Sequence, residues 1–336
     1  LLSVQEAHTL AHCAVFRGDF TALAAQEVAG ATPAILTSLI DHSLLHQTVD
    51  GRFEVHELVR QYAAEQLFVS PPTAAQVYDR HSSYYMEFLA LLEQSQNRDH
   101  AAQLAIRADL DNIRAAWLWA IDQKKIAALA RALKSLARFY YLVGFLGEAT
   151  NMLIIAITRV RTLLSEPDQP IATLQHLLAH LLNEEAFFEA MLGRHEVASQ
   201  FIQEAIGLAQ GLADPALEAL GHLRLGDIAW IRADYPTHRT AYMLSLTLVR
   251  QSTQRSLEAH CLSNLGMSHE QLGEYAEAIA AYEAALTIAR ELGNRQQESI
   301  VYNNLGVSYK RLGDFGKALQ YYQQTLQLSR ELGDQE

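Results

Sequence analysis

One histidine stands where a side chain could act on a ligand. His56 lies in the stretch GRFEVHELVRQYAAEQL, residues 51–67, between residues typical of a short β-hairpin and residues typical of an amphipathic helix. A histidine ring at the mouth of a helix can donate a hydrogen bond to a phosphate oxygen, and it titrates near neutral pH. The alternative is structural: the ring caps helix 57–67 and packs against Tyr62. Taken alone, this stretch favours the structural alternative.

Patterns for catalysis or metal binding are weak elsewhere. His8 and His12 have a spacing that could hold zinc, but HTLAH lacks the glutamate of H-E-x-x-H and no third ligand is evident. The sequence contains neither a G-x-x-x-x-G-K-[ST] phosphate loop nor a nucleophile elbow. Cys13 and Cys261 follow no metal or redox spacing, which indicates free thiols in a reducing cytosol. We therefore expect a non-catalytic, cytoplasmic chain without a cofactor of its own.

Composition narrows the class of protein further. A chain of 336 residues exceeds one ordinary core, so it predicts either two domains or a repeat array. The chain has 38 acidic residues and 26 lysines and arginines, and the resulting net charge of −12 opposes binding to nucleic acid or to an anionic membrane. No apolar run reaches the ~18 residues that span a bilayer. The start at Leu1, without a methionine or a signal sequence, suggests a piece of a longer protein.

The second half of the chain repeats every 40 residues. NLGMSHEQLGEYAEAIAAYEAALTIARELGN from Asn264 aligns with NLGVSYKRLGDFGKALQYYQQTLQLSRELGD from Asn304, and further copies begin at Arg224 and Glu184 without a gap. Glycine inside a helix costs about 1 kcal/mol, so Gly266 predicts close approach of another backbone. The pattern is a helix hairpin repeated along an axis. It resembles the tetratricopeptide repeat, in a forty-residue form similar to that of Pins-type adaptors and kinesin light chains, at Leu265, Gly266, Tyr275, Ala278, Tyr282 and Ala285.

Such hairpins stack so that the first helix of each pair lines an inner wall. In related peptide-binding repeats, the residue before Leu-Gly is often an asparagine that holds the main chain of a peptide, since an amide donates and accepts. Asn264 and Asn304 occupy this place; the alternative is that they join neighbouring helices. We expect a protein, a peptide or a small-molecule inducer in a groove lined by Asn183, Glu184, Arg224, Asp227, Asn264, Met267, Asn303, Asn304, Lys310 and Arg311.

The first part of the chain has a different pattern. Short helical stretches, a hairpin signal at Asp50-Gly51 and a further helix predict a winged-helix domain over residues 1–68. VSPPT at 69–73 predicts a boundary, followed by a helical linker over 69–125. A superhelix of about five hairpins then covers 126–336, with an inserted loop at 164–170. The expected fold class is therefore all-α: a winged helix with a small β-hairpin, followed by an α-solenoid.

The order of motifs in residues 1 to about 165 resembles bacterial STAND ATPases with NB-ARC modules, in the region after the nucleotide-binding module. The motifs are FRGDFTALAAQEVAG, LIDHSLL, GRFEVHELVRQYAAEQL, RHSSYYMEFLA and DLDNIRAAWLWAI. In that family the wing ends in a Met-His-Asp triplet whose histidine reaches the β-phosphate of bound ADP. Val55-His56-Glu57 stands there, so the resemblance implies nucleotide sensing by His56, while Val55 and Glu57 depart from the pattern.

The resemblance implies a function for the whole chain. It identifies the chain as the sensor and autoregulatory arm of a STAND ATPase, whose ADP or ATP site lies in an upstream P-loop module and which forms oligomers only when activated. The alternative is a constitutive tetratricopeptide scaffold that binds a partner peptide without switching. A third class, a DNA-binding regulator, requires basic groups, but residues 1–68 carry three arginines against eight acids, a formal charge of 3 − 8 = −5.

Overall fold

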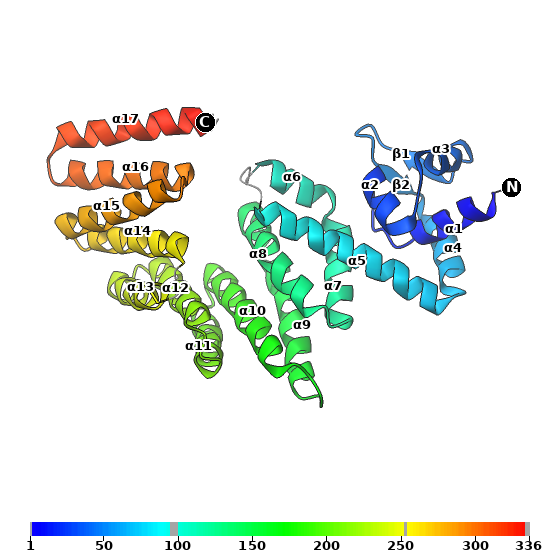
Figure 1. Cartoon of the computed structure of the whole chain (residues 1–336), viewed down its shortest axis with the longest axis horizontal. Helices are drawn as coiled ribbons and strands as arrows, with labels where there is room; N and C mark the ends of the chain where they lie inside the picture. Colours follow the sequence, from blue (N-terminus) through cyan, green and yellow to red (C-terminus); the bar gives the residue numbers. More distant parts are fainter. Residues whose placement is uncertain (1, 95–99, 252–253, 333–336) are drawn as a thin grey trace. The chain divides into compact units, whose positions relative to one another are not determined.

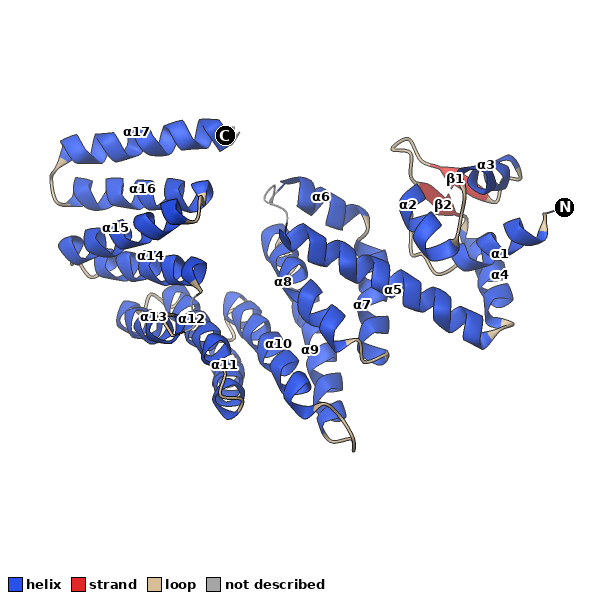
Figure 2. Cartoon of the chain, viewed as in Figure 1, coloured by secondary structure: helices blue, strands red, loops and turns tan. Residues whose placement is uncertain are grey.

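The computed structural model describes residues 2–94, 100–251 and 254–332. Contacts between Cα atoms divide the chain into two compact units, residues 1–166 and 167–336. Helices make up most of both units, and the described strands are a single pair in the first unit (Figure 2). The chain is therefore an all-α array of helix hairpins, as the sequence predicts.

The first unit begins with a small head in which helices surround the strand pair. The strands pair antiparallel, with Leu45 opposite Val55 and Gln47 opposite Phe53, and Gly51 in the connecting turn has a φ of +77°. The hairpin predicted at Asp50-Gly51 is thus present, but each strand has only three residues. The elements of the head are α1 (Val4–Cys13), α2 (Ala22–Ala24), η1 (Ala25–Ala29), α3 (Pro33–Asp41), β1 (Leu45–Gln47), β2 (Phe53–Val55) and α4 (Glu57–Phe68).

Side-chain caps determine where the head helices begin. Ser3 and Glu6 form a reciprocal capping box at α1, and Thr32 caps α3 before a proline in its first turn. No single described helix is long and apolar enough to cross a membrane, although the bent pair Ala22–Ala29 and Pro33–Asp41 passes that test together.

Five helices complete the first unit: α5 (Pro71–Gln94), α6 (His100–Ala108), α7 (Leu110–Asp122), α8 (Ile126–Val143) and α9 (Leu146–Leu164). α4 and α5 are separated by Val69 and Ser70 alone, because proline is accepted in a first helical turn; the predicted boundary at 69–73 is a short joint. The α8–α9 hairpin, predicted as the first repeat, falls within the first unit. Its helix α8 packs against α5, and the Ser135 hydroxyl donates to the Leu89 carbonyl at 2.8 Å.

The second unit is a stack of four hairpins with a fixed spacing. Its second helices start at His195, Tyr235, Tyr275 and Phe315, so that each begins 40 residues after the one before. This confirms the predicted period, and Figure 1 shows α14 to α17 stacked in chain order. The helices are α10 (Ile171–Met191), α11 (His195–Gly211), α12 (Pro215–Ile231), α13 (Tyr235–Val249), α14 (Arg255–Gln271), α15 (Tyr275–Glu291), α16 (Arg295–Arg311) and α17 (Phe315–Leu332).

Glycine permits the tight packing within these hairpins. A Cβ added at Gly266 would lie 2.5 Å from a ring carbon of Tyr282, and one at Gly306 would lie 2.6 Å from Tyr322. Real Cβ atoms do not approach ring carbons so closely, so a tyrosine ring of the second helix fills the space beside each of these glycines. The sequence predicts close approach of a backbone at Gly266, but the structure places the side chain of Tyr282 there, fully buried in the core.

Candidate functional site

His56 connects the strand pair to the following helix. Its Nδ1 accepts a hydrogen bond from the backbone N–H of Leu58 at 3.3 Å, so the ring caps α4 as the structural alternative requires. An Nδ1 that accepts leaves the ring proton on Nε2. The ring is exposed, and within the described part of the chain Nε2 has no hydrogen-bond partner. Capping therefore leaves a donor of His56 facing solvent.

The two residues beside His56 are held by local contacts. Val55 is buried in the head, with 7% of its surface exposed. Glu57 accepts hydrogen bonds from Arg60 at 2.7 and 2.8 Å and from Gln61 at 2.9 Å, and the Arg60 bonds lower the pKa of Glu57 to about 2. A cavity of about 80 Å³ beside them has room for a few water molecules and not for a nucleotide.

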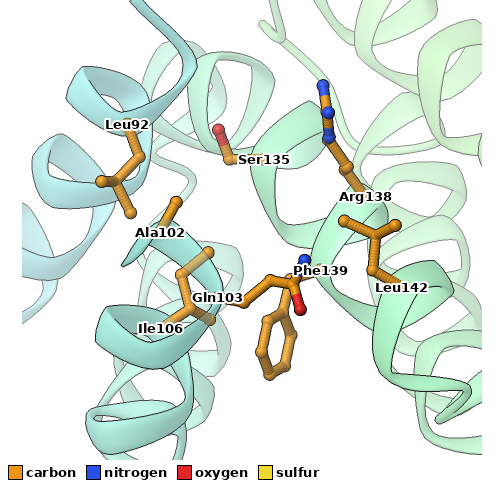
Figure 3. A pocket seen from close by; sticks show the side chains of 8 residues that line it. All are labelled: Leu92, Ala102, Gln103, Ile106, Ser135, Arg138, Phe139 and Leu142. Carbon is orange, nitrogen blue, oxygen red and sulfur yellow. The ribbon is translucent and has the colours of Figure 1, made fainter. Parts of the chain in front are cut away.

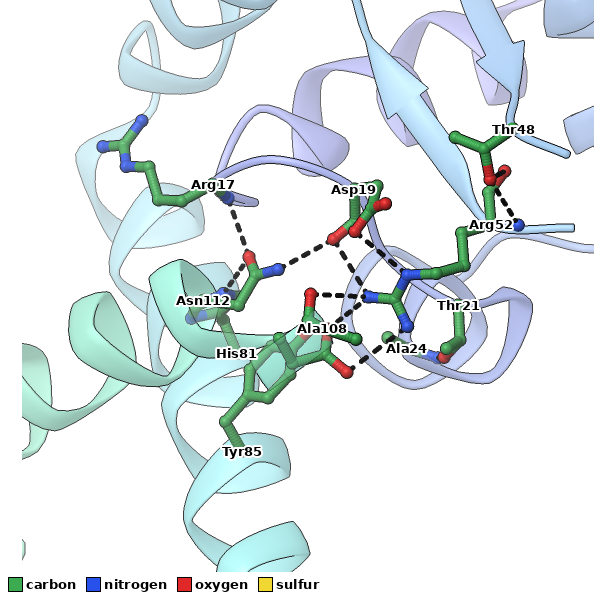
Figure 4. Close-up of polar contacts among 11 residues, drawn as sticks. Arg17, Asp19, Thr21, Ala24, Thr48, Arg52, His81, Tyr85, Ala108 and Asn112 are labelled. Atoms are coloured by element: carbon green, nitrogen blue, oxygen red, sulfur yellow. Dashed lines mark hydrogen bonds and ion pairs between the residues drawn. The ribbon is translucent and has the colours of Figure 1, made fainter. Parts of the chain in front are cut away.

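Arg52, in the turn before β2, joins the head to the helices that follow. Its Nε lies 3.0 Å from a carboxylate oxygen of Asp19, and its Nη2 lies 2.6 Å from Asp109, the residue before α7 (Figure 4). The hydroxyl of buried Tyr85 on α5 donates to the same Asp109 carboxylate at 3.1 Å. These charges are mostly shielded from solvent, so the hairpin is fixed to α5 and α7 by charge-assisted hydrogen bonds.

A buried asparagine strengthens this connection. The Asn112 side chain accepts from the Arg17 backbone N–H at 2.7 Å and donates to the Asp19 carbonyl at 2.9 Å. His81 lies 3.3 Å from the same Asn112 oxygen, and burial lowers the pKa of His81 to about 4. The network around Arg52 was not anticipated, because its partners are distant in the sequence.

A second cavity of the first unit is too small to be a ligand site. Its volume is about 30 Å³, which is room for about one water molecule. Side chains of α5, α6 and α8 surround it (Figure 3): Leu92, Ala102, Gln103, Ile106, Ser135, Arg138, Phe139 and Leu142.

In the repeats, predicted wall residues that stand 40 positions apart are joined by hydrogen bonds. Arg224 on α12 donates to both carboxylate oxygens of Glu184 on α10, at 2.7 and 2.8 Å, and contacts Asp227 at 3.2 Å. Asp227 in turn accepts from the Tyr242 hydroxyl at 2.6 Å. Burial disfavours the charged guanidinium, but Glu184 and Asp227 hold the pKa of Arg224 above its usual value. Glu184, Arg224 and Asp227 therefore connect α10, α12 and α13.

Asn183 has no access to a groove. Only 1% of its surface is exposed, and its amide donates to the Ala179 carbonyl of its own helix at 2.9 Å. The sequence predicts it in the wall because it is next to Glu184, but adjacent residues of a helix point about 100° apart. A ligand in solvent cannot reach Asn183, so we remove it from the candidate site.

The two asparagines before Leu-Gly remain accessible. Asn264 is half-buried and donates to the His260 carbonyl of its own helix at 3.0 Å. Asn304 is half-buried as well, and it has no hydrogen-bond partner in the part of the chain that the structure describes. Neither amide joins two of the described helices, unlike the Glu184–Arg224 pair at the same repeat position.

The other predicted groove residues fall into two kinds. Met267 is partly buried and packs against the core formed by α12 to α17. Asn303, Lys310 and Arg311 on α16 are exposed. The first helices also contact each other directly, α10 with α12 and α14 with α16, so exposed side chains of α16 share a wall with those of α14.

Metal binding and thiol chemistry find no support in the described residues. No three histidine, cysteine, aspartate or glutamate side chains are grouped there to hold a metal ion. The rings of His8 and His12 stack with centroids 6.4 Å apart. Burial raises the pKa of Cys13 to about 12 and that of Cys261 to about 11, so both thiols stay protonated at neutral pH.

A group of tyrosines in the last hairpin was missed by the sequence analysis. Tyr302 on α16 and Tyr321 on α17 line a cavity of about 440 Å³ together with Arg290 on α15. The signal was available: 40 residues earlier the corresponding positions are Leu262 and Ala281. Tyr302 and Tyr321 thus replace the leucine and the alanine of the preceding repeat.

Comparison with families supports the repeat assignment. Residues 217–291 and 257–331 match the tetratricopeptide repeat model, and residues 130–221 match that of anaphase-promoting complex subunit 5. Comparison with curated proteins finds no match.

Three solved structures are similar to the chain. A STAND protein with a tetratricopeptide repeat sensor from Pyrococcus horikoshii is 18% identical over 99% of this chain, with a TM-score of 0.49. The chain spans only 52% of that protein's length. BtubC (BKLC) from P. vanneervenii is 18% identical over 66% of this chain and 92% of its own, with a TM-score of 0.55.

The apo form of RapI also has a TM-score of 0.55, at 11% identity over 92% of this chain and 77% of its own. At such identities the two structures with the higher TM-score indicate the fold alone. Together with the family match, they make the chain a helical-repeat protein of the tetratricopeptide type.

Proposed function

We propose that this chain is the sensor and autoregulatory arm of a STAND-type signal-transduction ATPase. Its repeats bind a protein, a peptide or a small-molecule inducer, and the head, as a winged helix, passes this binding to a nucleotide-binding module of the parent protein. The observation that carries the proposal is the pair Asn264 and Asn304, which stand at equivalent places of one wall and form no hydrogen bond between the described helices. Side chains that stacking does not use are available for a ligand.

The geometry at His56 supports the second half of the proposal. The ring must cap α4 and also offer a donor, and the cap through Nδ1 achieves both because it places the proton on exposed Nε2. A phosphate oxygen of ADP is a suitable acceptor for such a proton. Glu57 is engaged by Arg60, so His56 is the residue of the triplet that we assign to the nucleotide.

The network around Arg52 supplies a physical connection for the signal. β2 ends immediately before His56, and Arg52 at its beginning is bonded to Asp109 at the start of α7. A displacement of α7 therefore moves the segment that holds His56. For such a switch, the ligand must bind one conformation of the protein better than the other.

The binding step is tested with the full chain. A partner captured from the native host is identified, and its dissociation constant is measured with the wild type and with the double variant Asn264→Ala and Asn304→Ala. We expect the double variant to bind at least about tenfold more weakly, since each lost amide removes hydrogen bonds worth about 0.5–1.5 kcal/mol. Gln323→Ala, an exposed amide on α17, is the matched control. An unchanged affinity of the double variant rejects the site.

A constitutive scaffold is the second candidate, favoured by the Glu184–Arg224–Asp227 network that braces the wall. A scaffold would use the same wall to bind its partner, but it would not need to transmit this binding to a nucleotide-binding module. The two are separated in the parent protein by the rate of nucleotide exchange, with and without the partner. A scaffold leaves this rate unchanged, whereas a sensor arm changes it in the wild type and less in Arg52→Met.

A further inference from the structure

The cavity of about 440 Å³ in the last hairpins is large enough for a small ligand. It is lined by Glu283 and Arg290 of α15, by Tyr302 of α16, and by Gln320, Tyr321 and Gln324 of α17. Tyr302 precedes Asn304 by two residues, which is about 200° around a helix. The cavity therefore opens on the opposite side of α16 from the wall that carries Asn304.

An arginine is held in position at one end of this cavity. The Nη2 of Arg290 donates to the Tyr302 hydroxyl at 2.6 Å, and its guanidinium carbon lies 5.6 Å from the centre of the same ring. Glu298 on α16 lies 4.0 Å from its Nε. The Arg290 side chain is nevertheless 56% exposed, while Tyr302 is 5% exposed. A cation is thus fixed against a buried ring and still faces solvent.

Aromatic rings continue from Tyr302 along α17 and α16. The Tyr321 ring lies 6.0 Å from that of Tyr302 and stacks on Tyr309 at 5.5 Å with an interplanar angle of 11°. The ammonium of Lys317 lies 4.8 Å from the centre of the Tyr309 ring. Three tyrosine rings therefore lie in sequence, the first two tilted by 33° and the last two nearly parallel, with a cation near each end.

The repeat itself shows that stacking does not require these side chains. Forty residues earlier, Leu262 stands for Tyr302, and Ala280, Ala281 and Ala284 stand for Gln320, Tyr321 and Gln324. Gln320 and Gln324 are exposed, as their counterparts Ala280 and Ala284 are, so exposure to solvent does not account for the glutamines. Nor does it account for the buried tyrosine whose hydroxyl is bonded to Arg290, because a leucine fills the equivalent place in the preceding hairpin.

The spacing of the polar groups indicates what the cavity can hold. Arg290 and Glu283 are seven residues apart on one helix, or about 10 Å along its axis. An extended peptide covers the same length with about three residues. Gln320 and Gln324 lie one helical turn apart on another helix that lines the cavity, and each amide can donate to and accept from a main chain.

We propose that this cavity binds an extended peptide segment of about three residues. A carboxylate of the segment pairs with Arg290, a basic group lies near Glu283, and the main chain bonds to Gln320 and Gln324. This site is independent of the function proposed above for the wall with Asn264 and Asn304.

The test uses the full chain with ¹³C-labelled tyrosine rings, titrated with the peptide acetyl-Lys-Ala-Ala-Glu-amide. We expect saturable shifts of the Tyr302 and Tyr321 resonances. The peptide with Gln in place of Glu, and the variant Arg290→Gln with the original peptide, should each bind about tenfold more weakly, since a charged hydrogen bond contributes about 1.5–3 kcal/mol. Arg250→Gln is the matched control, because Arg250 occupies the same place one repeat earlier and pairs with Glu258. It should leave the affinity unchanged.

Three results would overturn the proposal: no saturable shift of these two tyrosines, an equal loss in Arg250→Gln, or full affinity in Arg290→Gln. Loss of binding in the Asn264→Ala and Asn304→Ala double variant, with full affinity in Arg290→Gln, assigns the peptide to the inner wall instead. The two proposed sites therefore fail or succeed separately. Gln324→Ala provides a second variant, in which an exposed side chain is shortened without loss of charge.

Discussion

The role of a single residue in this protein depends on its surroundings and not on its residue type alone. His56 was open to two interpretations, and the structure shows that its ring caps a helix through one nitrogen and presents the other to solvent. Arg224 connects helices because two carboxylates bond to it, whereas Asn264 and Asn304, at the same repeat position, form no hydrogen bond to another of the described helices. A repeat position therefore does not have one role throughout an array.

The first prediction concerns the glycine beside a buried ring. Gly266→Ala places a Cβ about 2.5 Å from Tyr282, so we expect the free energy of unfolding to fall by about 1–2 kcal/mol although alanine favours a helix. Gly207→Ala, in the interior of α11 with no atom near its added Cβ, should raise it by about 0.5–1 kcal/mol. Urea unfolding measures both changes. Equal effects in the two variants would contradict the packing argument.

The second prediction concerns acid sensitivity. Burial lowers the pKa of His81 to about 4, so the folded state favours the neutral ring. The stabilisation is complete above the unfolded pKa of about 6.5 and is lost as the pH falls towards 4, by about 1 kcal/mol per pH unit from this group. His81→Gln should weaken that pH dependence, whereas exchange of exposed His46 should not. Trp117 fluorescence follows unfolding of this unit, and an unaltered pH profile in His81→Gln speaks against the assignment.

At the level of elements, the sequence predicted the repeats more completely than the first unit. The starts of α11, α13, α15 and α17, the helix-ending Gly273 and Gly313, and the loop before α10 follow from 40-residue spacing, turn glycines and prolines. These are local signals. The attachment of α8 and α9 to the first unit, and the Arg52 network, depend on contacts between distant residues that no local pattern encodes.

The third prediction tests that network. Arg52→Met leaves the Asp109 carboxylate, which is only about a tenth exposed, without its cationic partner, so we expect a loss of about 3 kcal/mol in the free energy of unfolding. Hydrogen exchange at the amides of β1 and β2 should accelerate with it. Arg60→Gln removes an exposed pair with Glu57 and should cost less than about 1 kcal/mol. If the double variant with Asp109→Asn shows additive losses, the two side chains are not coupled.

At the level of the whole molecule, the candidate site was only partly predictable. The wall with Asn264 and Asn304 follows from repeat position, but the buried state of Asn183 and the pairing of Arg224 depend on side-chain packing that the period does not specify. The tyrosine cavity was visible only as a departure from the repeat. Departures of this kind are informative because stacking alone does not require them.

The fourth prediction uses the fixed spacing. Deletion of residues 255–294 removes one whole repeat and joins Gln254 to Arg295, the residue 40 positions after Arg255. Because each hairpin contacts mainly its neighbours, the shortened chain should fold cooperatively with a helical circular-dichroism spectrum. Deletion of residues 255–290 shifts the register by four residues and should give an unstable or aggregated product. Equal stability of the two products would show that the period does not govern packing.

The same spacing has a genetic consequence. Like-placed codons in this stretch are separated by a constant number of bases, so unequal exchange between two copies of the gene adds or removes one complete hairpin and preserves the junctions on both sides. The array can in this way lengthen, shorten or be reordered in single steps, while substitutions of individual side chains, such as the tyrosines that replace leucine and alanine in the last hairpin, give each block its own surface.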